Sequence, residues 1–394
     1  MARGERFGGE KAVCRDEESG REVLRLTSRR EWNTQPTYHV NGFLEGGRLA
    51  FAAQEGGRTN LYVSEFDSGE IVQLIEGAGS FYRLHALGSG HGDGEGTDAF
   101  HMAAAYHRHE VYFVEGQLLK RVNAETLEQE ELFDLGEEWI CGVLELSGDE
   151  KQVLLPLLDA ECFRGKRDLA EYLKRCDHME LRSRLQAVRT DGSGGSVLWE
   201  ERGRFIGHAM FCPTDSRYIL ADRATDPARA DEPLLWIIDV EEQRTWPMET
   251  RNPKTGHSSW LADGSGVLTH GVVRPPGDRA GAEYVQILNR DGSSRWISYH
   301  GPPRYYGHCH STPRGTAITD AIVRPDAITA IRPLGEGRGE GSTTETLCVH
   351  RTSWEGYGQL THPHPHVSPD GRWLSFGAYR DGRKDLYVLD CSDL

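Results

Sequence analysis

Three histidines stand at alternate positions in the segment GQLTHPHPHVSPDG near the end of the chain. His362, His364 and His366 are separated by prolines and come just before a Ser-Pro-Asp-Gly turn. The prolines hold the segment extended and remove backbone donors, which is typical of a strand that begins at the edge of a sheet. Side chains alternate between two faces in such a segment, so we predict that the three imidazoles point to one side and that His308 and His310 also share a side. Neutral imidazoles gathered on one face are typical ligands of a first-row divalent metal.

A second pattern relates these histidines to others along the chain. Four histidines each stand five residues before the second residue of a repeated tight turn: His208, His257, His308 and His364. The shared register predicts that they lie at the start of the innermost strand of successive structural units, where they crowd the mouth of one channel. The alternative is that single histidines cap turns or satisfy buried backbone groups, and it stays open for His208, His310 and His366.

The candidate metal ligands are His308, His362, His364 and Gln359. The amide oxygen of Gln359, three residues before His362, would add an oxygen donor to a set of imidazoles. Cys309 alternates with its histidine neighbours, so we expect its side chain to pack inside the sheet.

The turns belong to a unit of short strands that recurs about every fifty residues. In the last copy, Ser368–Gly377 is a tight turn followed by an alternating strand, and Asp385–Asp390 is a second strand. This repetition predicts an all-β, seven-bladed β-propeller in which residues 1–394 form one domain. A two-sheet β-sandwich is the alternative architecture.

Two segments have particular places in the predicted propeller. Arg21–Thr27 is predicted as the first strand, and it would complete the last blade by pairing beside the C-terminal strands, which removes an exposed edge. Arg167–Cys176 has a helical pattern and is predicted as part of an insertion in the third blade, near residues 166–182.

Composition and charge exclude several classes of protein. The formal net charge of −16 argues against nucleic-acid binding, which needs a basic face, and an anionic ligand would need positive charge from arginines or a metal. No window approaches ~20 apolar residues, so we expect no membrane span. The charged N-terminus has no apolar signal region, and the eight scattered cysteines fit reduced thiols, so we expect a cytoplasmic protein.

The segment from Gln359 to Gly371 resembles the signature of the oligogalacturonate lyases. His257–Gly264, with the sequence HSSWLADG, and His308–Gly315, with the sequence HCHSTPRG, are similar to further segments of that family. The resemblance covers most of the chain, and its most specific part is the segment that begins at Gln359.

The resemblance implies a seven-bladed propeller, a manganese-type divalent ion and β-elimination in short uronate oligosaccharides. By position, it implies His257 as the general base and the four candidate ligands above as the metal set. This chemistry agrees with the residues, because a divalent cation on a uronate carboxylate stabilises the charge that develops when the adjacent proton is removed. A histidine with a pKa near neutrality can take that proton. The predicted partner is a small anionic oligosaccharide.

One position departs from the family pattern and affects substrate binding. Leu234 stands where the family has an arginine just before the tryptophan of the fourth blade. Arg223 or Arg229, in the preceding loop, would substitute for it, and His208 is a further candidate for substrate contact.

Other functions stay open on the sequence alone. A different uronate disaccharide, of the rhamnogalacturonan or glucuronide type, is an alternative substrate. A metal-dependent hydrolase or isomerase of sugar acids would use the same site. A non-catalytic propeller that binds a partner protein is a further alternative, because such proteins contain the same Ser-Pro-Asp-Gly turns.

Overall fold

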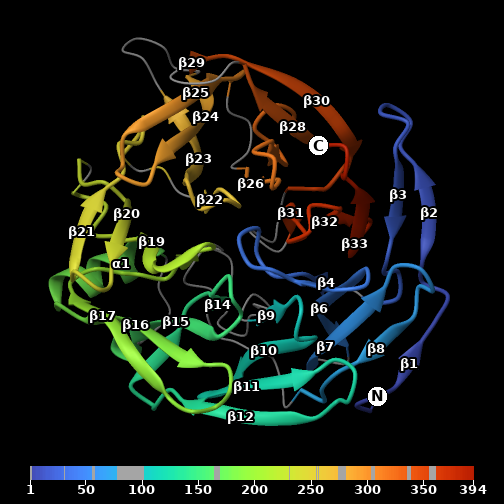
Figure 1. Cartoon of the computed structure of the whole chain (residues 1–394), viewed down its shortest axis with the longest axis horizontal. Helices are drawn as coiled ribbons and strands as arrows, with labels where there is room; N and C mark the ends of the chain where they lie inside the picture. Colours follow the sequence, from blue (N-terminus) through green and yellow to red (C-terminus); the bar gives the residue numbers. More distant parts are fainter. Residues whose placement is uncertain are drawn as a thin grey trace.

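The repeated turns join antiparallel strands that are arranged as blades around a central channel in a computed structural model of the chain (Figure 1). The structure describes residues 2–30, 32–55, 58–77, 102–163, 169–229, 231–253, 255, 257–273, 281–302, 307–334, 339–354 and 361–394. The sheets make up a seven-bladed β-propeller, so the predicted architecture is confirmed and the two-sheet sandwich is excluded.

The first four blades follow the order of the sequence, and the chain runs through each of them from its inner to its outer strands. The first blade holds β5 (Phe43–Leu44), β6 (Arg48–Glu55), β7 (Arg58–Glu65) and β8 (Ile71–Gln73). The second holds β9 (Met102–Ala105), β10 (Glu110–Glu115), β11 (Leu118–Asn123) and β12 (Gln129–Asp134). In the third, β13 (Trp139–Cys141) and β14 (Glu145–Leu146) both pair with β15 (Gln152–Asp159), followed by β16 (Arg182–Arg189) and β17 (Gly195–Arg202). The fourth holds β18 (Ala209–Cys212), β19 (Asp215–Asp222), β20 (Leu235–Asp239) and β21 (Arg244–Pro247).

The last three blades carry most of the histidines. The fifth holds β22 (Ser259–Trp260), β23 (Gly266–Val273), β24 (Ala282–Asn289) and β25 (Ser294–Tyr299), with β29 (Gly339–Glu340) parallel to β25. The sixth holds β26 (Cys309–Ser311), β27 (Ala317–Thr319), β28 (Ala327–Pro333) and β30 (Ser342–Val349). The seventh holds β31 (His366–Val367), β32 (Trp373–Arg380), β33 (Arg383–Asp390), β3 (Glu22–Arg25) and β2 (Ala12–Arg15).

The ring closes through the N-terminal segment, as predicted. Strand β3 pairs antiparallel with β33, with Val23 opposite Leu389, and the N–H of Leu26 donates to the carbonyl of Leu386 at 2.8 Å. Strand β4 (Trp32–Thr34) then pairs with both β33 and β6, which joins the seventh blade to the first. Two strands at the start of the chain were not predicted: β2 adds to the outside of β3, and β1 (Arg6–Phe7) adds to the outside of β8. Both are short and largely exposed, so they lack the alternating apolar pattern from which strands are predicted.

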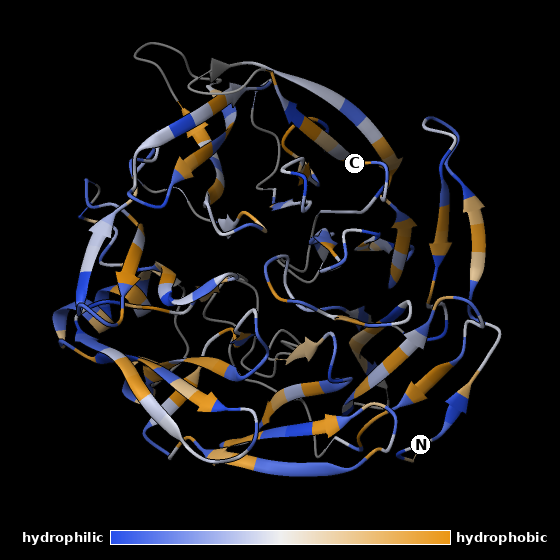
Figure 2. Cartoon of the chain, viewed as in Figure 1, coloured by the Kyte–Doolittle hydropathy of each residue, from blue (hydrophilic) through white to orange (hydrophobic). Residues whose placement is uncertain are grey.

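The blades adhere through apolar residues that alternate along the middle strands. Leu154 and Leu185 of the third blade, for example, share a buried cluster with Ile219 and Ile238 of the fourth. The outermost strand β12 is mostly exposed, and Figure 2 shows it as largely hydrophilic. Helix α1 (Leu169–His178) lies with the 3₁₀ helix η2 (Ala160–Phe163) in the connection between β15 and β16 of the third blade. Among the described residues, no helix is long and apolar enough to cross a bilayer.

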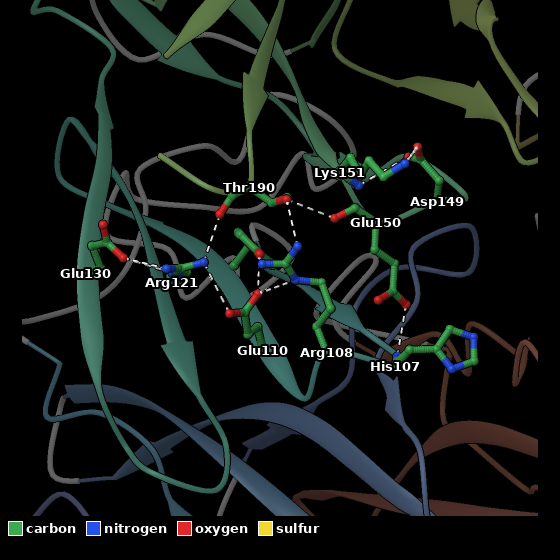
Figure 3. Close-up of polar contacts among 10 residues, drawn as sticks. His107, Arg108, Glu110, Arg121, Glu130, Asp149, Glu150, Lys151 and Thr190 are labelled. Atoms are coloured by element: carbon green, nitrogen blue, oxygen red, sulfur yellow. Dashed lines mark hydrogen bonds and ion pairs between the residues drawn. The ribbon is translucent and has the colours of Figure 1, made fainter. Parts of the chain in front are cut away.

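Polar contacts add to this adhesion near the second and third blades (Figure 3). The guanidinium of Arg121 donates to the carboxylate of Glu110 at 3.2 Å and to the carbonyl of Thr190 at 2.8 Å. The carboxylate of Glu150, in the turn of the third blade, accepts the N–H of His107 in the turn of the second at 3.0 Å. The contacts of Thr190 and Glu150 hold turns of the third blade against the second.

The Ser-Pro-Asp-Gly turn that follows β31 shows why glycine is needed there. Gly371 has a φ of +73°, a left-handed conformation that other residues rarely adopt, and its N–H donates to the carbonyl of Ser368 at 2.8 Å. A Cβ atom at Gly371 would lie 3.0 Å from the ring of Pro313 in the turn of the sixth blade. The glycine therefore serves both the turn and the close approach of two blades.

Candidate metal centre and active site

The histidines of the shared register lie immediately before the innermost strands of four successive blades. His208 precedes β18, His308 precedes β26, and His257 and His364 stand two residues before β22 and β31. Two of them have left-handed backbones, with φ of +56° at His257 and +50° at His364. Non-glycine residues in this conformation are uncommon and are concentrated at functional sites. The innermost strands thus begin at one end of the channel, where blades five, six and seven bring their histidines together.

Three imidazoles from two blades converge on one point. Nitrogen atoms of His308, His362 and His364 all lie within 4.8 Å of one another. The ring centroids of His308 and His364 are 4.2 Å apart, and those of His308 and His362 are 5.2 Å apart. His308 and His364 are buried, whereas His362 keeps partial exposure. The three candidate metal-ligating histidines therefore form one group at the channel.

The carboxylate of Asp320 fixes which nitrogen of His308 carries a hydrogen. Nδ1 of His308 lies 2.8 Å from Oδ2 of Asp320, and the backbone N–H of His308 donates to Oδ1 at 2.7 Å. Burial raises the pKa of Asp320, but the attraction and hydrogen bonds of His308 outweigh it and leave that pKa below its usual value. The carboxylate is therefore an acceptor, and Nδ1 of His308 carries the hydrogen that lies between them. Histidines that bind metals are commonly held by a carboxylate in this way.

Burial also keeps the other two imidazoles neutral. It lowers the pKa of His362 to about 3 and that of His364 well below its ordinary value, with the neighbouring His308 adding to both shifts. The buried Nδ1 of His362 has no hydrogen-bond partner among the described residues. Two neutral imidazoles that converge with His308, and a buried nitrogen of this kind, fit a first-row divalent cation.

His257 lies directly against this group. Its ring stacks on that of His308 with centroids 4.4 Å apart and an angle of 26° between the planes. Nδ1 of His257 lies 3.1 Å from the carbonyl oxygen of Gly307, which can only accept, so Nδ1 carries the hydrogen and the lone pair is on Nε2. Burial, helped by His308 and His270, lowers the pKa of His257 well below its ordinary value. His257 is therefore a neutral imidazole beside the three candidate metal-ligating histidines, and burial holds its pKa below the near-neutral value expected from the sequence.

The ring of Tyr38 packs against the histidines of this group. Its ring lies 5.5 Å from that of His257, 5.1 Å from that of His308 and 6.4 Å from that of His364. Its hydroxyl donates to the carbonyl of Ser258 at 3.2 Å. Tyr38 comes from the segment between β4 and β5 and is 1% exposed, so the first blade contributes to a site whose histidines come from the fifth to the seventh.

The histidines fall into two groups, which corrects one prediction. His310 and His366 pair with each other, with ring centroids 4.2 Å apart, and line a separate cavity of about 270 Å³ together with His39. This cavity is bounded by the turns of the blades, so it opens at the end of the channel opposite to the group around His308. The three alternate histidines of the last blade therefore do not act together. The reason is that residues 361–365 are not part of a strand and His364 has a left-handed backbone, so strand alternation does not apply there.

The predicted substrate-contacting residues are not gathered at the three-histidine group. His208 lies beside His39, with ring centroids 5.4 Å apart, and its Nδ1 is 3.7 Å from a carboxylate oxygen of Asp222. The guanidinium of Arg223 forms an ion pair with Glu201 at 2.5 Å and lies over the ring of Trp236.

Arg229 follows β19 in the sequence, and its side chain lies beside the C-terminal end of helix α1. It pairs with Asp177 at 3.0 Å and with Glu232 at 3.4 Å. Asp177, His178 and Asp226 also have ligand atoms within 4.8 Å of one another, but His178 is exposed and pairs with Asp226 at 2.9 Å, as in an ordinary surface ion-pair cluster. Leu234, at the position of the family arginine, donates its N–H to the carbonyl of Pro253.

Some predicted residues lie outside the described residues, and some important ones were not predicted. Gln359 belongs to the first kind. Asp320 and Lys384 belong to the second, and both are buried near the three-histidine group. Burial lowers the pKa of Lys384 to about 7 against the attraction of Asp320. For Asp320, a single charged residue within the apolar stretch AITDAIV was the available signal, since buried charges are rare unless they are paired.

The seven blades and the imidazoles that converge at one end of the channel define the class of the molecule: a β-propeller with a candidate metal site in its channel. The chain belongs to the oligogalacturonate lyase family, whose model matches residues 1–394.

Individual relatives match along their whole length. An oligogalacturonide lyase of Pectobacterium atrosepticum is 22% identical over 422 residues, which cover 100% of this chain and 99% of the relative. An oligogalacturonate lyase of Dickeya dadantii is 21% identical over 417 residues, with the same coverage of the two chains. Among solved structures, an oligogalacturonate lyase in complex with manganese has a TM-score of 0.77 at 19% identity and covers 99% of this chain and 98% of its own. An oligogalacturonate lyase from Vibrio parahaemolyticus has a TM-score of 0.78 at 20% identity, again covering 99% and 98%. At these identities, the two structures support the fold.

Proposed function

We propose that this protein is a metal-dependent lyase that cleaves short oligogalacturonides by β-elimination. The observation that carries the proposal is the convergence of three imidazoles, with His257 stacked directly on one of them. Membership of the oligogalacturonate lyase family and the names of the relatives support the substrate class.

His308, His362 and His364 would hold the metal, with Gln359 as the predicted oxygen donor. Manganese is the proposed ion, supported by the manganese complex of a structurally similar lyase and by the match between neutral imidazoles and a first-row divalent cation. When bound, the ion would neutralise the uronate carboxylate and stabilise the negative charge that develops beside it.

His257 would act as the general base. Its Nε2 lone pair takes the proton from C5 of the uronate, the C5–H electrons form the C4–C5 double bond, and the C4–O bond breaks with its electrons on the leaving oxygen. The hydrogen bond from Nδ1 to the carbonyl of Gly307 holds the tautomer that this step needs and stabilises the imidazolium that forms.

His208, Arg223 and Arg229 are the proposed substrate contacts. Both arginines already pair with carboxylates, so the substrate would have to compete with Glu201 at Arg223 or with Asp177 and Glu232 at Arg229. The side chain of Arg229 is 48% exposed and that of Arg223 is 11% exposed, so Arg229 is the more accessible partner for an anionic sugar.

The test is product formation from digalacturonate by the manganese-loaded protein. The proposal expects an unsaturated product, detected by new ultraviolet absorbance. Because elimination adds no water, the masses of the two products should sum to the mass of the substrate. Products that contain added water would show that the reaction is hydrolysis and not elimination. Elimination in a rhamnogalacturonan or glucuronide disaccharide, but not in digalacturonate, would confirm the proposed reaction and contradict the proposed substrate. No turnover of any of them by a protein that binds manganese would contradict the proposal.

A further inference from the structure

One carboxylate touches metal-ligating histidines of two different blades. Asp320 directly follows β27 of the sixth blade and is 0% exposed. Its Oδ2 lies 2.8 Å from Nδ1 of His308, in its own blade, and 3.3 Å from the backbone nitrogen of His364, which leads into the seventh. Its Oδ1 accepts the backbone N–H of His308 at 2.7 Å. The carboxylate therefore restrains the ring of one ligand and the backbone of two.

The backbone carbonyl of the same residue leads to the third histidine. Nε2 of His350 donates to the carbonyl oxygen of Asp320 at 2.9 Å, and Nδ1 of His350 accepts the N–H of Thr352 at 3.1 Å. The hydroxyl of Thr352 in turn donates to the carbonyl of Thr361 at 2.8 Å, and Thr361 directly precedes His362. Hydrogen bonds thus connect Asp320 directly to two candidate ligands and, through His350 and Thr352, to the residue that precedes the third.

Burying a charged carboxylate such as that of Asp320 costs free energy of folding. Removing an ion from water costs several kcal/mol even after the protein relaxes, about the size of a large mutational effect. The buried side chain of Lys384 lies on the same side: a Cβ at Gly377 would collide with its Cε, and the N–H of Gly377 donates to the carbonyl of Pro363, between His362 and His364. The site therefore contains a negative and a positive group behind its ligands, where apolar side chains would have been less costly.

We propose that Asp320 is the positioning residue of the metal site: its carboxylate and carbonyl hold the histidines of blades six and seven in one geometry. The inference rests on the proposed metal-binding function. It requires no titration of Asp320, only its hydrogen bonds. Residues that hold metal ligands in this way contribute about 10-fold to 100-fold to metal affinity.

The test compares Asp320→Asn with a matched control, Asp239→Asn. Asp239 is also a fully buried carboxylate, but it ends β20 of the fourth blade and is held by Arg217 at 2.8 Å and by Arg244 at 3.3 Å. After chelation, each protein is titrated with Mn²⁺ by calorimetry at a temperature far below unfolding, and Co²⁺ is added separately to record its visible spectrum. Asp320→Asn should bind Mn²⁺ about 10-fold to 100-fold more weakly and shift the Co²⁺ bands, because the ligand geometry has changed. Asp239→Asn should lose stability and keep both readouts.

The outcomes separate this inference from the proposed function. If the unaltered protein binds no Mn²⁺, the proposed metal site fails and the inference falls with it. If the unaltered protein binds Mn²⁺ and Asp320→Asn binds it equally well with the same Co²⁺ spectrum, the positioning role alone is overturned.

A second variant covers the case in which Asp320→Asn does not fold. His350→Leu removes the link from the Asp320 carbonyl toward His362, whereas His350→Gln keeps a donor and an acceptor. We expect weaker Mn²⁺ binding in the leucine variant and partial recovery in the glutamine variant. Unchanged affinity in His350→Leu would overturn the proposal.

Discussion

The two ends of the central channel are built from the same residue type and differ in what holds each imidazole. At one end, His308 is oriented by the carboxylate of Asp320, and its ring lies against those of His257 and His364. At the other end, Nδ1 of His366 donates to the carbonyl of Tyr38 at 2.8 Å, and Nδ1 of His310 accepts the N–H of Val367 at 3.3 Å.

This difference decides what each end can bind. Among the described residues, the nitrogens of His39, His310 and His366 do not form a group within 4.8 Å, although all three line one cavity. Both nitrogens of His39 are buried without a hydrogen-bond partner in the described part of the chain, so even an unpartnered imidazole does not make a metal site unless others converge on it. At the first end, the Asp320 carboxylate contacts the ring of His308 and the backbone nitrogens of His308 and His364, and our inference is that such contacts are what make the rings converge.

The largest expected effect comes from removing two ligands together. His362→Ala/His364→Ala should lower the bound metal from about one equivalent to none, because a single remaining imidazole binds a divalent cation weakly. Metal analysis of the purified proteins after incubation with manganese measures this. The matched control is His310→Ala/His366→Ala, which removes two histidines from the other end. Metal retained in the first double variant would mean that the ligands lie elsewhere.

Removing the proposed base should lower the rate but leave the metal. His257→Ala should lower kcat for elimination by about 10²-fold to 10⁴-fold, the usual contribution of a general base, with metal content unchanged. Initial rates of unsaturated product formation and metal analysis on the same samples measure both quantities. Full activity in this variant would remove His257 from the mechanism.

Both ends of the channel should make the metal-free protein sensitive to acid. Burial lowers the pKa of four histidines to about 4: His208, His270, His350 and His366. In the unfolded chain these imidazoles titrate near 6.5, so between about pH 6.5 and pH 4 the unfolded state binds more protons than the folded state. The free energy of unfolding should therefore fall as the pH falls through this window and be insensitive to these groups above it.

Denaturant unfolding at pH 7, 6 and 5 measures this dependence. His366→Gln keeps a donor for the carbonyl of Tyr38 but removes one titrating group, so it should reduce the slope by up to about 1.4 kcal/mol per pH unit. An identical slope in His366→Gln would mean that His366 titrates normally in the folded protein.

The smallest expected effect is at a single histidine of the second group. His310→Ala should leave Mn²⁺ affinity unchanged within about twofold, because its ring is not part of the converging set. Calorimetric titration of this variant beside His308→Ala, two residues away, compares the two ends directly. A large loss of affinity in His310→Ala would show that the two ends of the channel are coupled.

Much of the fold follows from local patterns in the chain. The turn at Ser368–Gly371 and the strand after it recur in other blades, and the repeat is enough to predict a propeller closed by the N-terminal segment. Strands β1 and β2 were not predicted, because their pairing depends on an edge supplied by distant strands and not on an apolar pattern of their own. The shared position of the histidines could be predicted for the same reason as the fold, because the histidines recur at a fixed distance from the repeated turns.

The division of the histidines could not be read from the chain. Alternation predicted one group for His362, His364 and His366, but the left-handed backbone at His364 and its contact with Asp320 separate His366 from the others. Asp320 itself gave little signal, since a carboxylate is identified as a positioning group only by what surrounds it.

The propeller, its closure and the histidines that begin its inner strands are all specified locally, because turn chemistry and strand alternation are properties of short segments that repeat along the chain. Which imidazoles converge depends instead on the packing of the blades. His308 and His364 come from adjacent blades and contact the same carboxylate, and no spacing in the chain specifies that contact. The charge of His362 and His364 depends on the same packing, because burial lowers the pKa of both imidazoles and keeps them neutral and able to bind a cation.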